Sequence, residues 1–192
     1  MKVGIIGAGS VGSATAFALV MRGVARKVVL IDANEQRAMA EAMDIAHATP
    51  FAYANKVKCG TYKDLEGAEV VIVTAGANQK PGETRIDLLG RNVKIFESII
   101  PQVVAAAPNT TLLITANPAD IMTEVALRLS GFPRERVIGS GTVLDTSRFR
   151  TLLGYHLGVS PKSIHANVLV NMATARFWFG QTEMPERFRL TN

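Results

Sequence analysis

A glycine-rich turn near the amino terminus constrains the fold of this chain more than any other feature. Gly7, Gly9 and Gly12 are spaced as G-x-G-x-x-G, directly after an apolar run and before a stretch of helical pattern. In such a turn the first glycine permits a tight bend, the second lets a ligand approach the backbone, and the third lets helix and strand pack closely. A carboxylate, Asp32, ends the second apolar run, twenty residues after Gly12. This context predicts a strand–turn–helix unit whose backbone N–H groups face an anion.

Short apolar runs rich in Val and Ile alternate with helical patterns along most of the chain. Runs with little polar alternation are typical of strands buried on both faces of a parallel sheet. We expect strands at Lys2–Ile6, Lys27–Ile31, Glu69–Thr74, Thr111–Thr115, Val137–Gly139 and Ile164–Leu169. We expect helices at Val11–Met21, Glu35–His47, Ile86–Ala107, Ala119–Leu129 and Leu144–Leu157, with Pro101 kinking or splitting the third. The predicted fold class is therefore α/β, a doubly wound parallel sheet with right-handed crossovers.

Composition narrows the classes of partner. The 192 residues suffice for one domain and part of a second. The formal net charge of +5 comes from scattered basic residues, which favours small anions such as dinucleotides and carboxylates over nucleic acid. The single cysteine, Cys59, excludes a disulfide framework and makes the cytoplasm the expected location. We expect no signal peptide, no membrane-spanning segment and no metal site, and we interpret Cys59 as a small hydrophobic residue of a strand.

The glycine turn and Asp32 together predict a dinucleotide site. The N-terminus of the following helix offers unpaired N–H groups and a positive dipole end to phosphates. Asp32 can accept hydrogen bonds from ribose hydroxyls and repels a 2′-phosphate, so NAD is favoured over NADP. The alternative is a glycine turn with a strand-end aspartate and no ligand.

Three further segments follow strand ends, where ligands of open α/β sheets bind. They are Thr74–Arg85, which contains Gly76, Pro81 and Gly82 and is expected to be a mobile loop, Ile114–Asp120 and Gly139–Arg150. Taken with the glycine turn, their order and spacing resemble the lactate/malate dehydrogenase family from Met1 to about Leu169. The similarity is greatest to bacterial L-lactate dehydrogenases.

The resemblance implies roles for five residues around a 2-oxo or 2-hydroxy acid substrate. Arg85 would polarise the substrate carbonyl, Arg148 would grip the carboxylate, and Asp145 would orient a catalytic histidine. Asn117 would hold substrate and nicotinamide ribose. Gln79 would face the variable end of the substrate, where a neutral amide suits pyruvate and an arginine would favour oxaloacetate; malate is the alternative substrate. The alternative for Asp145 and Arg148 is an exposed i,i+3 salt bridge.

The resemblance also implies a set of cofactor contacts: Gly7, Gly9, Val11, Gly12, Asp32, Arg37, Tyr62, Gly76, Ala77, Ser98, Thr115, Asn117 and Ser140. Arg150 and His165 match positions that bind fructose 1,6-bisphosphate in allosteric bacterial members. A surface arginine and a strand histidine remain the alternative at those two positions. The intact parent is expected to be a homotetramer.

The resemblance breaks after Leu169. The family continues Gly-Glu-His-Gly-Asp, with the histidine as catalytic acid and base, whereas this chain reads Val170-Asn171-Met172-Ala173-Thr174. Met172 stands at the histidine position and cannot transfer a proton. One nucleotide string can encode residues 170–181 in one frame and, with a preceding G, the family sequence in another. We therefore hypothesise that residues 170–192 are the product of a frameshift; a native divergent tail is the alternative.

These observations predict three segments. Residues 1–142 form an NAD-binding Rossmann domain, 143–169 begin the substrate domain, and 170–192 are an off-family tail. The intact parent would transfer a hydride between NADH and pyruvate or L-lactate, whereas this chain would bind NAD(H) with little or no turnover. The alternatives are a stand-alone NAD(H)-binding module and a self-associating structural fragment.

Overall fold

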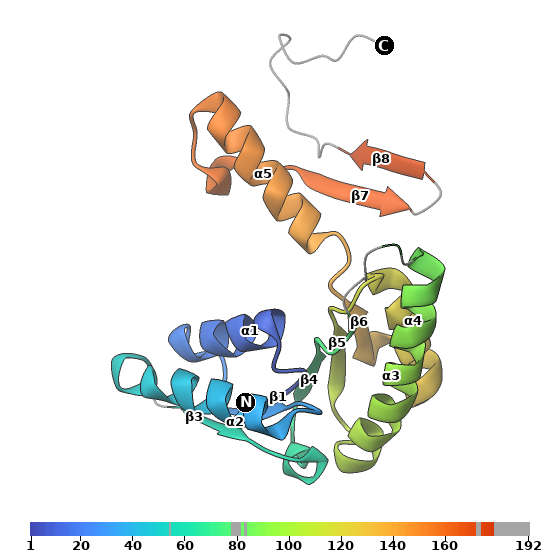
Figure 1. Ribbon diagram of the computed structural model, residues 1–192. Helices are drawn as coiled ribbons and strands as arrows, with labels where there is room; N and C mark the ends of the chain where they lie inside the picture. Colours follow the sequence, from blue (N-terminus) through green and yellow to red (C-terminus); the bar gives the residue numbers. More distant parts are fainter. Residues whose placement is uncertain (54, 78–81, 83, 172–173, 179–192) are drawn as a thin grey trace. The chain divides into compact units, whose positions relative to one another are not determined.

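A computed structural model (Figure 1) describes residues 1–53, 55–77, 82, 84–171 and 174–178. The chain divides into two compact units, one ending at Gly139 and the other beginning at Ser140. Each unit has its own sheet. The units are described separately below.

The first unit contains a six-stranded parallel sheet with the strand order β3-β2-β1-β4-β5-β6. Its strands are β1 (Lys2–Ile6), β2 (Lys27–Ile31), β3 (Lys56–Cys59), β4 (Val70–Val73), β5 (Thr111–Ile114) and β6 (Val137–Gly139). This is the doubly wound order, in which the direction of winding reverses between β1 and β4. The predicted fold class is confirmed. The carboxyl ends of β1 and β4 flank the point of reversal, where α/β proteins of this type bind their ligands.

Helices cover both faces of this sheet, and each face has its own core (Figure 1). The helices are α1 (Ser10–Met21), α2 (Glu35–His47), α3 (Arg85–Ala106) and α4 (Ala119–Ser130), with the 3-10 turns η1 (Thr49–Phe51), η2 (Tyr62–Leu65) and η3 (Arg134–Arg136). Buried residues of α1 and α2, such as Ala16 and Ile45, pack on one face. Phe96 of α3 and Met122 of α4 pack on the other. Burial on both faces explains why the central strands have almost no polar alternation.

The secondary structure departs from the expected elements in three places. Lys56–Cys59 forms β3, an edge strand that is missing from the expected strands, although the interpretation of Cys59 as a strand residue is confirmed. Its lysines alternate with the less exposed Val57 and Cys59, so it lacks the continuous apolar run of the central strands. The last expected strand, at 164–169, forms as β7 (Asn167–Asn171) and lies outside the parallel sheet. Pro101 lies inside α3 without splitting it, so the expected split is wrong and the kink stays a prediction. Pro101 and Glu97, whose carbonyl loses its helical partner, are both exposed, so water can replace the missing N–H.

The second unit packs α5 (Val143–Leu157) and the turn η4 (Pro161–Ser163) with an antiparallel pair of strands. β7 pairs with β8 (Thr174–Trp178), with Asn167 opposite Trp178. The Thr146 hydroxyl accepts a hydrogen bond from the Val168 amide at 3.0 Å, which ties α5 to β7. Part of the off-family tail, Thr174–Trp178, is thus a strand. Met172 lies outside the described residues.

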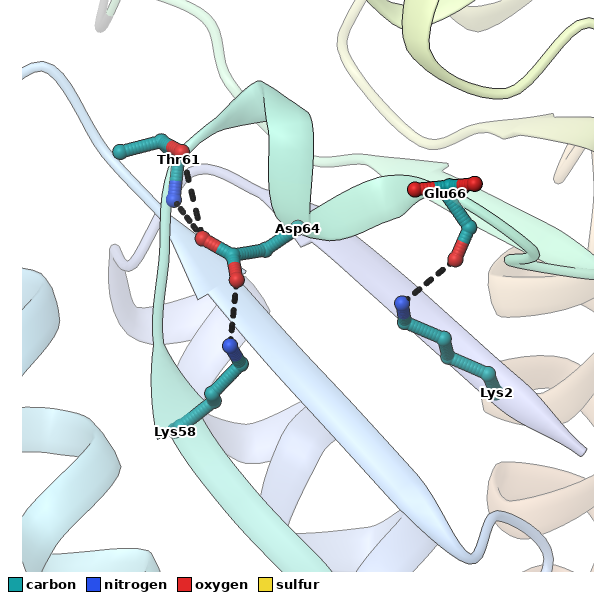
Figure 2. Close-up of polar contacts among 5 residues, drawn as sticks. All are labelled: Lys2, Lys58, Thr61, Asp64 and Glu66. Atoms are coloured by element: carbon teal, nitrogen blue, oxygen red, sulfur yellow. Dashed lines mark hydrogen bonds and ion pairs between the residues drawn. The ribbon is translucent and has the colours of Figure 1, made fainter.

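The turn η2 is held by a polar network at one end of β3 (Figure 2). The Asp64 carboxylate accepts hydrogen bonds from the Thr61 amide, at 2.8 Å, and from the Thr61 hydroxyl, at 3.2 Å. Its other oxygen pairs with the Lys58 ammonium. These donors favour the charged form, with Lys58 contributing most, and lower the pKa of Asp64 from 3.8 to about 2.

This lowered pKa predicts a pH dependence of stability. A group with a lowered folded-state pKa stabilises the fold above its unfolded pKa and loses that contribution as the pH falls through the folded pKa. We expect the free energy of unfolding of the wild-type chain, measured with urea, to fall between about pH 4 and about pH 2, and Asp64→Asn to remove part of that fall. Glu135→Gln, an exposed carboxylate of η3, is the control. Identical pH profiles for wild type and Asp64→Asn would show that the network does not act this way.

Candidate cofactor-binding site

The glycine turn between β1 and α1 is closed by contacts that leave no room for a side chain at Gly7 or Gly12. Gly7 has a φ of +105°, which non-glycine residues rarely adopt. A Cβ on Gly12 would overlap the Gly7 carbonyl oxygen and lie 2.9 Å from the Thr74 hydroxyl oxygen. That hydroxyl donates toward the carbonyls of Gly7, at 2.9 Å, and Ile6, at 3.2 Å. Thr74 therefore fixes the turn against the end of β4, a contact that the sequence analysis did not identify.

The N-terminus of α1 has neither a side-chain cap nor a negative charge. Its N-cap is Gly9, and its first turn contains no acidic residue. Each of the other four α-helices has an acidic residue in its first turn, and α2 and α3 are also capped by the side chains of Asn34 and Thr84. The first-turn N–H groups and the positive end of the α1 dipole are thus left for an external anion.

A cleft of about 550 Å³ opens at this N-terminus. Eight predicted cofactor residues line it: Gly7, Gly9, Val11, Gly12, Asp32, Arg37, Gly76 and Ser98. Thr74, Ile95 and Ile99 add lining that the sequence analysis did not assign. A Cβ built on Gly9 meets no atom within 4 Å, so the backbone there borders open space. The cleft therefore joins an uncapped helix N-terminus to a carboxylate, the arrangement that a dinucleotide requires.

Asp32 is held in place by the backbone around it. One carboxylate oxygen accepts a hydrogen bond from the Ala8 amide at 2.7 Å, and the other accepts one from the Asn34 amide at 2.9 Å. The first bond ties the end of β2 to the glycine turn. A carboxylate has about four acceptor positions, so Asp32 keeps capacity for ribose hydroxyls.

Asn92, on α3, connects two of the loops that carry predicted site residues. The side chain is 1% exposed. Its oxygen accepts from the Ala77 amide at 2.8 Å, and its nitrogen donates to the Asn117 carbonyl at 2.8 Å. Asn117 precedes Pro118 through a cis peptide bond. The sequence analysis missed Asn92; a polar residue in the apolar stripe of a long amphipathic helix was the available signal.

Tyr62 and Ser140 are not among the residues that line the cleft. Tyr62 lies in η2, where burial raises the pKa of its phenol, and lines a larger hollow of about 830 Å³. That hollow lies at the amino ends of β4 and β5, since it includes Ala68 and Asn109. It contains neither the glycine turn nor a strand-end carboxylate, so its size does not make it the cofactor site. Ser140 belongs to the second unit. Thr115 follows β5, and its hydroxyl donates to the Val73 carbonyl at 3.2 Å.

The predicted substrate and effector residues are only partly described. Arg85 is the first residue of α3, and Gln79 lies outside the described residues. Asp145 and Arg148 form an exposed i,i+3 ion pair at 3.6 Å. This is the salt bridge that we gave above as the alternative to a role in substrate binding. Arg150 donates to the Ala166 carbonyl at 2.7 Å and to the Asn167 side chain at 2.8 Å, which ties α5 to β7; His165 is exposed. Their functional roles stay predictions.

Within the described ranges, no group of three or more His, Cys, Asp or Glu side chains is arranged to hold a metal ion. Nor is any helix in that part of the chain long and apolar enough to cross a bilayer.

The bridge made by Asn92 generates a prediction about stability. Asn92→Leu keeps a similar volume but leaves the Ala77 N–H and the Asn117 carbonyl without their partner. Unpaired buried polar groups cost about 1–3 kcal/mol each, so we expect a loss of that order in the free energy of unfolding measured with urea. Asn109→Ala, at an exposed turn, is the control and should change little. Equal effects of the two substitutions would contradict this role.

Comparison with known proteins agrees with this geometry. Residues 1–139 match the model of the NAD binding domain of lactate/malate dehydrogenase. The chain is 60% identical over 169 residues to L-lactate dehydrogenase of Thermus aquaticus and 59% identical over 169 residues to that of Allorhizobium ampelinum. Each match covers 88% of this chain and 54% of the relative.

A solved structure shows the same architecture. The crystal structure of a minor L-lactate dehydrogenase from Enterococcus mundtii superposes with a TM-score of 0.84 at 42% identity, over 88% of this chain and 54% of that one. The chain thus spans about half the length of the curated relatives it matches. With its glycine turn, strand-end aspartate and parallel sheet, the chain belongs to the lactate/malate dehydrogenase family, and residues 1–139 are its NAD-binding domain.

Proposed function

We propose that this chain binds NAD(H) at the α1 cleft and, as it stands, turns over little or no pyruvate or L-lactate. The observation that carries the binding half is the uncapped N-terminus of α1 beside Asp32. The first-turn N–H groups of α1 would hold the diphosphate, and Asp32 the adenosine ribose. Because the carboxylate would repel a 2′-phosphate, NAD(H) is favoured over NADP(H).

The family resemblance supplies the substrate half of the proposal. When bound, the nicotinamide carries the hydride that is exchanged with the 2-carbon of the acid. Arg148 would hold the substrate carboxylate and Arg85 would polarise its carbonyl. The neutral Gln79 favours pyruvate over oxaloacetate, and Asn117 would contact substrate and cofactor. The Asp145–Arg148 ion pair would have to open for Arg148 to bind a carboxylate; at 66% side-chain exposure for Arg148, it is weak enough to exchange.

Low turnover follows from the residue at the position of the catalytic histidine. Met172 has no titratable proton, so Asp145 has no imidazole to orient and the substrate oxygen has no acid or base there.

We attribute residues 170–192 to a shift of reading frame, because one string of nucleotides can encode both this tail and the expected sequence. Sequencing the gene tests this origin. An intact frame with no alternative reading of the histidine segment would refute it.

One observation favours self-association as a second candidate function. Large apolar side chains of α5 are exposed, among them Leu144 at 58%, Leu152 at 67% and Tyr155 at 78%. Exposed apolar surface promotes association between chains. An apparent molecular mass in solution that rises with protein concentration would support this alternative.

Four other expectations also stay predictions: the stand-alone NAD(H) module, the fructose 1,6-bisphosphate site at Arg150 and His165, a tetrameric parent and a cytoplasmic location.

Two glycine substitutions separate folding from cofactor binding. Gly9→Ala should fold, because its φ of −77° suits any residue and its Cβ meets no atom, yet the methyl group would occupy space needed by the diphosphate. Gly12→Ala should lose roughly 1–3 kcal/mol of stability through overlap with Gly7. We expect Gly9→Ala to raise the Kd for NADH at least about tenfold in a calorimetric titration. Unchanged affinity in a folded Gly9→Ala chain would contradict the proposed site.

The turnover of this chain can be compared with that of a matched control chain. We expect no NADH oxidation above background when pyruvate is added to this chain, and rapid oxidation by a version with the family frame restored after Leu169. NADH binding to the wild-type chain, followed by calorimetry, establishes that it is folded. Turnover by the wild-type chain near that of the restored version would refute the proposal.

A further inference from the structure

Four lysines gather at the amino ends of three neighbouring strands. The parallel register places Lys2 of β1 beside Lys27 of β2, and Lys27 beside Lys56 of β3. Lys58, two residues after Lys56, points to the same side of β3, since side chains alternate along a strand. These four residues, here called the lysine row, line a hollow of about 260 Å³ together with Val28 and Val29.

The lysine row faces the side of the sheet on which η2 lies. Lys58 contacts Asp64 within η2, and Lys2 contacts Glu66, the residue that follows η2 (Figure 2). The crossover from β3 to β4 contains only this four-residue turn, whereas the crossovers that contain α1 and α3 have helices of 12 and 22 residues. The turn buries Leu65 against the sheet but leaves the amino ends of β2 and β3 exposed. Solvent at this edge allows the ammonium groups of Lys27 and Lys56 to stay hydrated.

Two of the four ammonium groups have fixed partners. Lys58 pairs with Asp64, and Lys2 donates to the Glu66 carbonyl at 2.6 Å. Glu69 is occupied by the α-amino group, at 3.6 Å, and by the Lys2 amide, at 3.3 Å. Lys27 and Lys56 are exposed, and the described residues give neither of them an ion pair with a carboxylate.

Like charges directly opposite each other on neighbouring strands are destabilising, and adjacent strands lie only about 4.8 Å apart. A bound anion with two or more charges would relieve this repulsion, since each charge could face one ammonium. The hollow is small, and two carboxylates lie at its flanks, Asp64 paired with Lys58 and Glu69 beside the Lys2 amide, which disfavours a long polyanion such as nucleic acid. Lysine binds phosphate as a point charge and requires no planar geometry.

We propose that the lysine row binds a small soluble anion that carries two linked phosphates. Lys27 and Lys56 make the principal contacts with the anion, because Lys2 and Lys58 already contact Glu66 and Asp64. The site is separate from the cofactor cleft because Lys2 and the glycine turn are at opposite ends of β1, roughly 13 Å apart at 3.3 Å per residue. Occupation of one site leaves the other free.

Inorganic pyrophosphate is the probe, titrated into the chain in the presence of saturating NADH so that the glycine turn is covered. The lysine side chains and the backbone amides are followed by NMR. We expect shifts at Lys27 and Lys56, with an affinity that weakens as salt is added. Shifts confined to residues 7–12, no shifts at all, or an equal response to sulfate would overturn the proposal.

Matched variants assign the binding to named residues. Lys27→Met with Lys56→Met should raise the Kd for pyrophosphate at least about tenfold and leave the Kd for NADH unchanged. Lys63→Met with Lys94→Met, two exposed lysines outside the row, should change neither. If the methionine pair does not fold, Lys27→Gln with Lys56→Gln serves instead. Equal pyrophosphate affinity in the wild-type and substituted chains would refute the assignment.

Discussion

The close contact between α1 and the turn after β1 is the constraint on which the rest of the first unit depends. Gly12 packs on the Gly7 carbonyl oxygen, and Thr74 bonds to the same oxygen from the end of β4. This contact directs the N-terminus of α1 at the reversal point of the sheet. Because Gly9 offers no side chain as a cap, the helix reaches that point with its first N–H groups free for a ligand.

The neighbouring elements serve the same arrangement. Asp32 bonds to Ala8 and so holds the end of β2 against the turn. On the other side of the reversal point, Asn92 joins the segment after β4 to the segment after β5. Both residues satisfy backbone groups that the ends of strands leave unpaired. The cofactor cleft is therefore lined by a backbone that is already ordered without a ligand, which lowers the entropic cost of binding.

The opposite end of the sheet has a different physical character. There the crossover to β4 is short, the first residues of β2 and β3 are exposed, and three lysines stand in register on β1, β2 and β3. The cofactor cleft lies at the carboxyl ends of the strands. The lysine row places positive charge at the amino ends of β1, β2 and β3. The two ends share the strands but not their ligands, since the extended backbone keeps them apart.

The fold class and the cofactor could be predicted from the residues alone, because Gly7, Gly9, Gly12 and Asp32 lie within one short strand–turn–helix–strand segment. The buried strands could also be predicted from the sequence, since burial on both faces leaves uninterrupted runs of Val and Ile. The edge strand β3, the Asn92 bridge and the lysine row depend on how distant segments pack together. Lys56–Cys59 became a strand only because β2 offered it an edge, and the Asn92 bridge and the lysine row join residues far apart in the chain. Such pairings depend on how strands align and on which backbone groups lack partners, and neither is encoded in any short stretch of residues.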